Sequence, residues 1–264
     1  MTYETITIDD RETEVWITLN RPDALNAISA TMMAELDRAL GAVEGRRTLA
    51  ALVVTGAGRA FCAGVDLKGA RARVSGDSPA AANAAFLDQL RLLLLRVEQF
   101  PAPVIAAVNG LALAGGLELV LCCDLVVAAQ SAKFGDAHAN HGLVPGGGSS
   151  VRLPRKIGVS RAKQLIYTGD FLSAEKLADW GLVNKVVADG DLATAVADMA
   201  AALASKSPTG LATMKRMVDR GQELGLDDAL RHELALNADH ASSFDRVEGL
   251  AAFAEKRKPR FEGR

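Results

Sequence analysis

The chain of 264 residues is long enough for one large domain, or for one domain with an appendage. Apolar residues make up 49 % of the chain, which excludes an intrinsically disordered protein. Because 30 Lys and Arg stand against 32 Asp and Glu, the net charge is −2, and this excludes a broad basic surface for nucleic acid.

The cysteines and the apolar stretches indicate the compartment. Cys62, Cys122 and Cys123 are odd in number and two of them are adjacent, which fits a reducing compartment rather than a disulfide framework. The opening residues lack the basic segment and the apolar run of a signal peptide. The best candidate for a membrane span, 101–117, contains two prolines and falls short of about 20 apolar residues. We therefore expect a cytoplasmic globular protein without membrane insertion.

The first third of the chain predicts strands that alternate with helices. A hairpin is expected over residues 5–19, where apolar residues alternate on either side of an Asp-Asp-Arg turn. Ser29 is expected to cap a helix that ends near Gly45, because apolar residues recur there at helical spacing. The apolar run 49–55 predicts a strand that is buried on both faces. Residues 69–85, rich in small and charged side chains, predict a mobile surface segment.

The same patterns continue to the end of the chain. They predict a helix at 86–100, a buried strand at 103–108, a helix at 115–123 and a strand at 125–129. Beyond these, the predicted helices are 173–180, 192–205, 208–224, 227–241 and 247–256. Strand–helix alternation followed by a helical tail predicts an α/β core with a helical C-terminal appendage.

Two segments with glycines follow predicted strands. In residues 59–68, small side chains let a backbone N–H approach a ligand, although an ordinary strand-to-loop turn has the same composition. Gly115 and Gly116 stand where a buried strand turns into a helix, so free N–H groups there can face an anionic oxygen. Glu118 follows in the first turn. A carboxylate that only complements the helix dipole suits an exposed face, whereas Glu118 has apolar neighbours, and this favours a functional carboxylate.

A third segment, 133–148, contains two of the four histidines, His138 and His141, together with Asp136. Their spacing is not that of a metalloprotease helix, so we expect no metal site. Three glycines close the segment without the Lys-Ser/Thr pair of a phosphate loop, and the Gly-x-Gly-x-x-Gly fingerprint is absent, which disfavours ATP and NAD sites. The basic stretch 253–261 is either a solvated helix end or a segment that places a positively charged side chain near a phosphate.

Taken together, these segments resemble the crotonase (enoyl-CoA hydratase/isomerase) superfamily over nearly the whole chain. Each motif alone is unspecific, but their common order and spacing are typical of this family. The matching motifs are R-P at 21–22, L-N-A at 25–27, F-C-A-G-V-D at 61–66, A-V-N-G at 107–110, G-G-L-E at 115–118, C-D at 123–124, F-G at 134–135, G-L-V-P-G at 142–146, T-G-D at 168–170, residues 178–183 and E-K-R-K-P at 255–259.

The resemblance implies a fold and a substrate class. It implies a crotonase-like spiral of ββα units over residues 1–200 and a helical trimerisation region over 201–264, with homotrimers or dimers of trimers as the assembly. It implies an acyl-CoA substrate, with coenzyme A as part of the substrate and no permanently bound cofactor. The oxyanion of an enolate intermediate would be bound by the backbone N–H groups of Val65 and Gly115. The residues expected along the coenzyme A path are Leu25, Asn26, Ala27, Ala63, Asp66, Lys68 and Lys256, the last near a nucleotide phosphate and across a subunit boundary.

The sequence departs from the family at one catalytic position. Family hydratases hold and deprotonate water with two glutamates. Glu118 matches the first, and His138 stands where the second is expected, four residues after Phe134. We expect Glu118 to act as base and water anchor, while His138 either protonates the α-carbon or only shapes the pocket.

This departure leaves three functions open. The leading hypothesis is an enoyl-CoA hydratase-like lyase. The alternatives are hydrolysis of a thioester or a β-dicarbonyl acyl-CoA, and a non-catalytic acyl-CoA-binding protein. Double-bond isomerases of the family are disfavoured, because they depend on the position that is histidine here.

Overall fold

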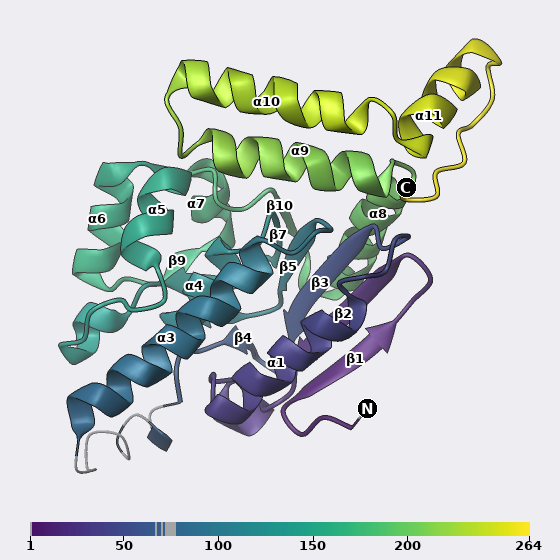
Figure 1. The fold of residues 1–264 in the computed structure, drawn as a ribbon. Helices are drawn as coiled ribbons and strands as arrows, with labels where there is room; N and C mark the ends of the chain where they lie inside the picture. Colours follow the sequence, from purple (N-terminus) through teal and green to yellow (C-terminus); the bar gives the residue numbers. More distant parts are fainter. Residues whose placement is uncertain (1, 67, 70, 72–77) are drawn as a thin grey trace.

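Six strands form the main sheet, in the spatial order β1-β2-β3-β5-β7-β10 (Figure 1). The computed structural model describes residues 2–66, 68–69, 71 and 78–264. The strands are β1 (Ile6–Asp10), β2 (Glu14–Leu19), β3 (Ala51–Gly56), β5 (Val104–Val108), β7 (Leu125–Ala129) and β10 (Lys185–Val187). β1 and β2 form the predicted antiparallel hairpin, and the other pairs are parallel. The inner strands are buried over most of their length, and β5 and β7 are apolar throughout, because helices or the second sheet cover both faces.

Four short strands form a second sheet, in the order β4-β6-β8-β9. They are β4 (Ala60–Cys62), β6 (Leu111–Leu113), β8 (Lys133–Gly135) and β9 (Leu172–Ser173). β4, β6 and β8 follow β3, β5 and β7 of the main sheet, so the chain passes repeatedly from one sheet to the other. A helix follows the second strand of a pair, as the expected ββα spiral requires.

Helices cover both faces of the main sheet (Figure 1). α8 (Leu192–Ala204) packs on one face and buries Val196 and Ala200 against strands β3, β5 and β7. On the other face, α1 (Ala30–Val43), α3 (Pro79–Glu98) and α4 (Gly115–Leu121) surround the larger core with the second sheet. All seven residues of α4 are buried, so its side chains lie between the two sheets and the covering helices. The remaining helices of this part are α5 (Ser149–Ile157), α6 (Val159–Thr168) and α7 (Ala174–Asp179), with 3-10 turns η1 (Pro22–Ala24), η2 (His138–His141) and η3 (Asp189–Asp191).

Three helices form the C-terminal region, as predicted. They are α9 (Pro208–Gly221), α10 (Leu226–His240) and α11 (Phe244–Ala254). α9 and α10 lie side by side, and α11 extends beyond their end (Figure 1). The predicted division at residue 200 falls inside α8, and the division of the chain into 1–200 and 201–264 stays a prediction.

Two helical parts of the fold differ from the sequence-based expectation. α3 begins at Pro79, so the end of the predicted mobile segment 69–85 is helical, because proline suits the first helical position and alanines follow. Residues 70 and 72–77 of that segment lie outside the described residues. The sequence does not predict α5 or α6, since a glycine run precedes α5 and Pro154 lies inside it.

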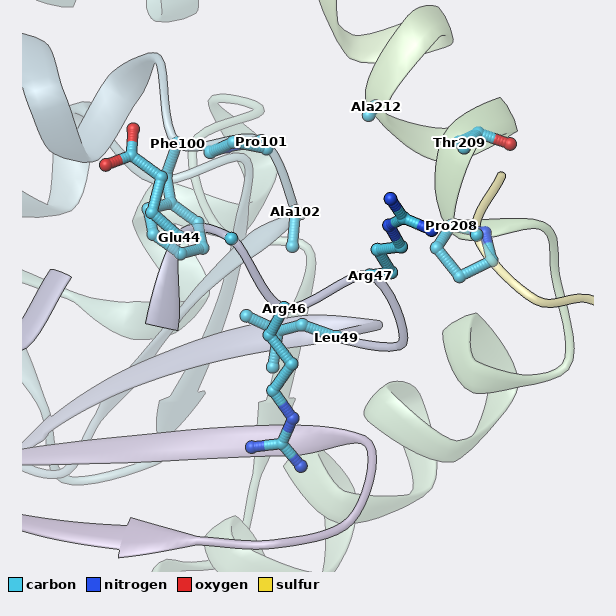
Figure 2. Close-up of a pocket in the computed structure, with 12 residues that line it drawn as sticks. Glu44, Arg46, Arg47, Leu49, Phe100, Pro101, Ala102, Pro208, Thr209 and Ala212 are labelled. Atoms are coloured by element: carbon cyan, nitrogen blue, oxygen red, sulfur yellow. The ribbon is translucent and has the colours of Figure 1, made fainter. Parts of the chain in front are cut away.

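Helix α9 and the C-terminal tail join the core around a cavity of about 170 Å³ (Figure 2). Its lining comes from the segment between α1 and β3, the segment before β5, the start of α9 and the C-terminal tail. The lining residues are Glu44, Gly45, Arg46, Arg47, Leu49, Phe100, Pro101, Ala102, Pro208, Thr209, Ala212 and Gly263. Two of these lining residues bind the buried carboxylate of Asp245. It accepts the hydroxyl of Ser207 at 2.6 Å, the hydroxyl of Thr209 at 3.1 Å and the N–H of Gly263 at 3.2 Å. Asp245 therefore ties the start of α9 to the C-terminal tail.

We expect Asp245→Ala to lower the free energy of unfolding by about 2–3 kcal/mol, because bonds to a charged acceptor are lost and buried donors are left unpaired. Urea unfolding measures the change. Asp227→Ala is the control, since Asp227 makes an exposed pair with Arg231 and should change stability by less than about 0.5 kcal/mol. Equal effects of the two substitutions would contradict the role given to Asp245.

Candidate functional site

The segment after β4 turns one backbone N–H away from the neighbouring segment around Ile28. The carbonyl of Gly64 accepts the N–H of Ile28 at 2.7 Å, and the N–H of Asp66 donates to the carbonyl of Ile28 at 3.0 Å. Because peptide groups alternate sides along an extended strand, the N–H of Val65 between them points to the opposite side. It donates a hydrogen bond to none of the described residues.

Helix α4 begins beside this segment, at Gly115. The N–H of Gly115 belongs to the first turn and has no acceptor within the helix. A Cβ added to Gly115 would lie 3.4 Å from the Cα of Gly64 and 3.5 Å from Cγ2 of Val65, so the two backbones are in contact. A Cβ on Gly116 would lie 1.9 Å from the carbonyl oxygen of Cys62, so only glycine fits there. Two unengaged N–H groups, of Val65 and Gly115, thus come from neighbouring segments.

Glu118 lies one helical turn after Gly115 and is 1 % exposed. Its Oε1 accepts the N–H of Gly147 at 2.8 Å and the N–H of Ser149 at 3.1 Å. A buried carboxylate is costly unless it is hydrogen-bonded, and these two amides meet that requirement at one oxygen. Oε2 has no hydrogen-bond partner among the described residues, and a Cβ on Gly147 would lie 2.4 Å from it. The carboxylate is therefore held by one oxygen and leaves the other for chemistry.

His138 forms a pair with Asp136, a residue to which the sequence assigns no role. Ala137 between them has a φ of 59°, and this left-handed turn brings the two side chains together. His138 Nδ1 lies 2.9 Å from Oδ1 of Asp136, whose carboxylate is fully buried. Oδ2 of Asp136 has no partner in the described part of the chain. A proton held at Nδ1 leaves Nε2 as the nitrogen that is available to a ligand.

Charge favours the protonated imidazole. Burial, the largest single influence, lowers the pKa of His138, but the hydrogen bond and charge of Asp136 and the charge of Glu118 together outweigh it. The pKa of His138 is therefore raised above its ordinary value of 6.5. Because the charge of Glu118 raises the pKa of His138, the two predicted catalytic side chains interact electrostatically.

Two segments that run side by side carry most of the predicted coenzyme A path. The N–H of Ala63 donates to the carbonyl of Leu25 at 3.0 Å. Arg21 donates to the carbonyl of Ala27 at 2.6 Å and to the carboxylate of Asp66 at 2.8 Å. The hydrogen bond from Arg21 lowers the pKa of the Asp66 carboxyl, which therefore stays charged. The structure thus brings these predicted residues together beside Val65.

The other three predicted members of this path are placed differently. The amide of Asn26 is fully buried and donates to the carbonyls of Ala57 and Ala60 at 2.9 and 2.8 Å, so only its backbone can face a ligand. Lys68 is exposed next to Asp66. Lys256 follows α11, which lies away from α4 within the chain (Figure 1). Its contact with a nucleotide phosphate stays a prediction that involves a second subunit.

Comparison with known proteins decides the family. The enoyl-CoA hydratase/isomerase family matches residues 10–264. The chain belongs to this family. A probable enoyl-CoA hydratase of Rhizobium meliloti is 39 % identical over 264 residues, which cover 100 % of both chains. The mitochondrial enoyl-CoA hydratase domain-containing protein 2 of Bos taurus is 41 % identical over 252 residues, 94 % of this chain and 83 % of the relative. A crystal structure of enoyl-CoA hydratase from Bacillus anthracis has a TM-score of 0.92 at 38 % identity, covering 99 % of this chain and 100 % of that one.

The enoyl-CoA hydratase/isomerase family membership confirms the predicted mixed α/β fold. In the part that the structure describes, no group of three His, Cys, Asp or Glu side chains could hold a metal ion. Burial raises the pKa of the Cys62 and Cys123 thiols to about 12, so these thiols are not nucleophiles. No described helix combines the length and the apolar character needed to cross a membrane.

Proposed function

We propose that this family member adds water to the conjugated double bond of a 2-enoyl-CoA. The observation that carries the proposal is Glu118, a buried carboxylate on the same helix as Gly115, whose N–H is unengaged and which packs against Val65. Donors that are aimed before the reaction begins stabilise developing negative charge on an oxygen, since they need no reorganisation in the transition state.

In the proposed reaction, the thioester oxygen binds between the N–H groups of Val65 and Gly115. Oε2 of Glu118 removes a proton from water while the water oxygen forms a bond to the β-carbon. The electron pair of the double bond moves toward the thioester, which gives an enolate. The Nε2–H of His138 then protonates the α-carbon. Glu118 has gained a proton and His138 has lost one, and exchange with solvent restores both, so one water is added in total.

The Asp136–His138 pair supports the role of His138 as the proton donor. Family hydratases use a carboxylic acid at this position, and a histidine can replace it only if it is protonated at working pH. The 2.9 Å contact with the buried carboxylate of Asp136 favours the imidazolium.

The same pair also supports a second candidate function. In its neutral form, the Nε2 of His138 is a base that can activate water. Attack of that water on the thioester carbonyl releases free coenzyme A, whereas attack on the β-carbonyl of a 3-oxoacyl-CoA releases a shortened acyl-CoA and a carboxylic acid. A non-catalytic acyl-CoA-binding protein is the third candidate, and the retention of Glu118 beside Gly115 argues against it.

Assays with crotonyl-CoA and a longer 2-enoyl-CoA test the proposed function. We expect the enoyl-thioester absorbance to fall without release of a thiol. A thiol-trapping reagent in the same cuvette detects any free coenzyme A. 3-Oxoacyl-CoA substrates, with chromatography of the products, test hydrolysis. No wild-type hydration, combined with activity gained by His138→Glu, would overturn the proposal and indicate another acyl-CoA reaction. Binding of acyl-CoA in calorimetry without any turnover would identify a binding protein.

We further propose the cofactor requirement, the compartment and the assembly of the protein. Coenzyme A enters only as part of the substrate, and no cofactor is permanently bound. The protein is cytoplasmic, has no nucleic-acid partner and forms a homotrimer or a dimer of trimers. Apolar side chains that are more than half exposed on α9 and α10 support self-association, namely Met214, Val218, Leu226, Leu230 and Leu234. Light scattering should give three or six times the mass of one chain.

A further inference from the structure

One ion pair holds the backbone on which Glu118 rests. Arg152, in α5, donates from Nη1 to the carbonyl of Gly147 at 2.9 Å. Its Nε and Nη2 donate to the two carboxylate oxygens of Glu98, the last residue of α3, at 2.9 and 2.7 Å. The side chains of Arg152 and Glu98 are 15 % and 34 % exposed, so the pair lies at a partly buried junction of α3, α5 and the glycine loop.

The glycine loop needs such an anchor because its sequence supplies none. Residues 146–148 are all glycine, so no side chain restricts the backbone. In the described part of the chain, the carbonyl of Gly147 accepts only the bond from Arg152. The N–H groups of Gly147 and Ser149, on either side of that carbonyl, are the two donors that bind Glu118. The Gly147 carbonyl belongs to the peptide between the two donor peptides, so holding it restrains both donors through the Cα atoms of Gly147 and Gly148.

We propose that Arg152 is a positioning residue: it holds the Gly147 peptide so that the two loop amides aim Glu118 at the attacking water, and Glu98 holds Arg152. The proposal rests on the proposed function, because it takes Glu118 as the base. A guanidinium suits this task because its rigid planar fork binds both oxygens of Glu98 and still reaches a carbonyl. Arg152 makes its hydrogen bonds to Gly147 and Glu98 and interacts with Glu118 through charge alone, so a variant that keeps the charge separates positioning from electrostatics.

A double-mutant cycle between Arg152→Met and Glu118→Gln in the full chain tests the proposal, with kcat and KM for crotonyl-CoA hydration. We expect Arg152→Met alone to lower kcat about tenfold and to change KM less than about twofold, because a misplaced base slows turnover without removing contacts to coenzyme A. In the Glu118→Gln background, where the base is already lost, the same substitution should change kcat less than about twofold. An equal loss in both backgrounds would overturn the proposal, since Arg152 would then act on the fold in general.

Further variants sharpen this test. Arg152→Lys keeps the charge but not the fork, and we expect kcat to stay close to that of Arg152→Met. Arg96→Met is the matched control, since Arg96 lies on α3 with Glu98 and also pairs with carboxylates, those of Asp37 and Glu44, away from the loop. It should lower stability and leave kcat unchanged. If Arg152→Met does not fold, Glu98→Gln replaces it in the double-mutant cycle with Glu118→Gln.

The cycle also separates this proposal from the proposed function. If Glu118→Gln lowers kcat and Arg152→Met does not, only the positioning role is wrong. If Glu118→Gln leaves kcat unchanged, the proposed function itself is wrong.

Discussion

Replacing Glu118 with glutamine is expected to lower kcat for crotonyl-CoA hydration by at least about a hundredfold, which is the scale of general acid–base catalysis. The amide has the size of the carboxylate, and its Oε1 can still accept the N–H groups of Gly147 and Ser149. It cannot take a proton from water. Calorimetry with a saturated acyl-CoA should give a Kd within about threefold of wild type, because the proposed contacts to coenzyme A lie on other segments.

Glu35 provides the matched control for this substitution. It is also a buried glutamate, and from α1 it binds the N–H groups of Glu4 and Thr5, just before β1, at 2.8 Å each. Glu35→Gln should lower the urea midpoint and leave kcat unchanged. Glu118→Gln should lower kcat and leave the urea midpoint unchanged. Full hydratase activity in Glu118→Gln would exclude Glu118 as the base.

Local sequence patterns predict most of the elements that carry the site. Ser29 is predicted as an N-cap, and its hydroxyl accepts the N–H of Met32 at 3.1 Å. The apolar run 125–129 coincides with β7. These features depend on neighbours in the chain, namely capping, spacing and the length of apolar runs. The family motifs add the pairing of Val65 with Gly115, and the two segments are indeed in contact.

Contacts between distant residues lie beyond such patterns. Glu118 binds Gly147, which is 29 residues further along, through a backbone N–H that leaves no mark in the sequence. Asp136 is visible beside His138, but their contact depends on Ala137 adopting a left-handed conformation that alanine rarely adopts. Asn26 belongs to a motif linked to coenzyme A, yet burial turns its side chain to the chain's own carbonyls. In each case tertiary packing, rather than residue type, determines the role.

Hydration activity is expected to fall on the alkaline side of the pH profile, as the His138 imidazolium loses its proton. Burial lowers the pKa of His138, but Asp136 and Glu118 together raise it above 6.5, so activity should persist up to the raised pKa and decline above it. Stability linked to His138 has the same sign, since it is complete below pH 6.5 and is lost as the pH rises through the raised pKa. Asp136→Asn keeps the shape of the partner and removes its charge. We expect the alkaline decline to move to lower pH, with about a tenfold loss of kcat near neutral pH and above.

An NMR titration of His138 in wild type and Asp136→Asn gives the pKa directly, and the kinetic decline must move with it. His138→Gln should abolish the decline and lower kcat about a hundredfold, because no acid then protonates the α-carbon. His141→Gln is the matched control, since His141 is exposed at the other end of η2 and its loss should leave the profile unchanged. Turnover that instead rises through the His138 pKa would mean that the neutral imidazole acts as a base. That outcome would favour hydrolysis of a thioester or a β-dicarbonyl acyl-CoA, because only a base, and not a proton donor, gains activity as Nε2 is deprotonated.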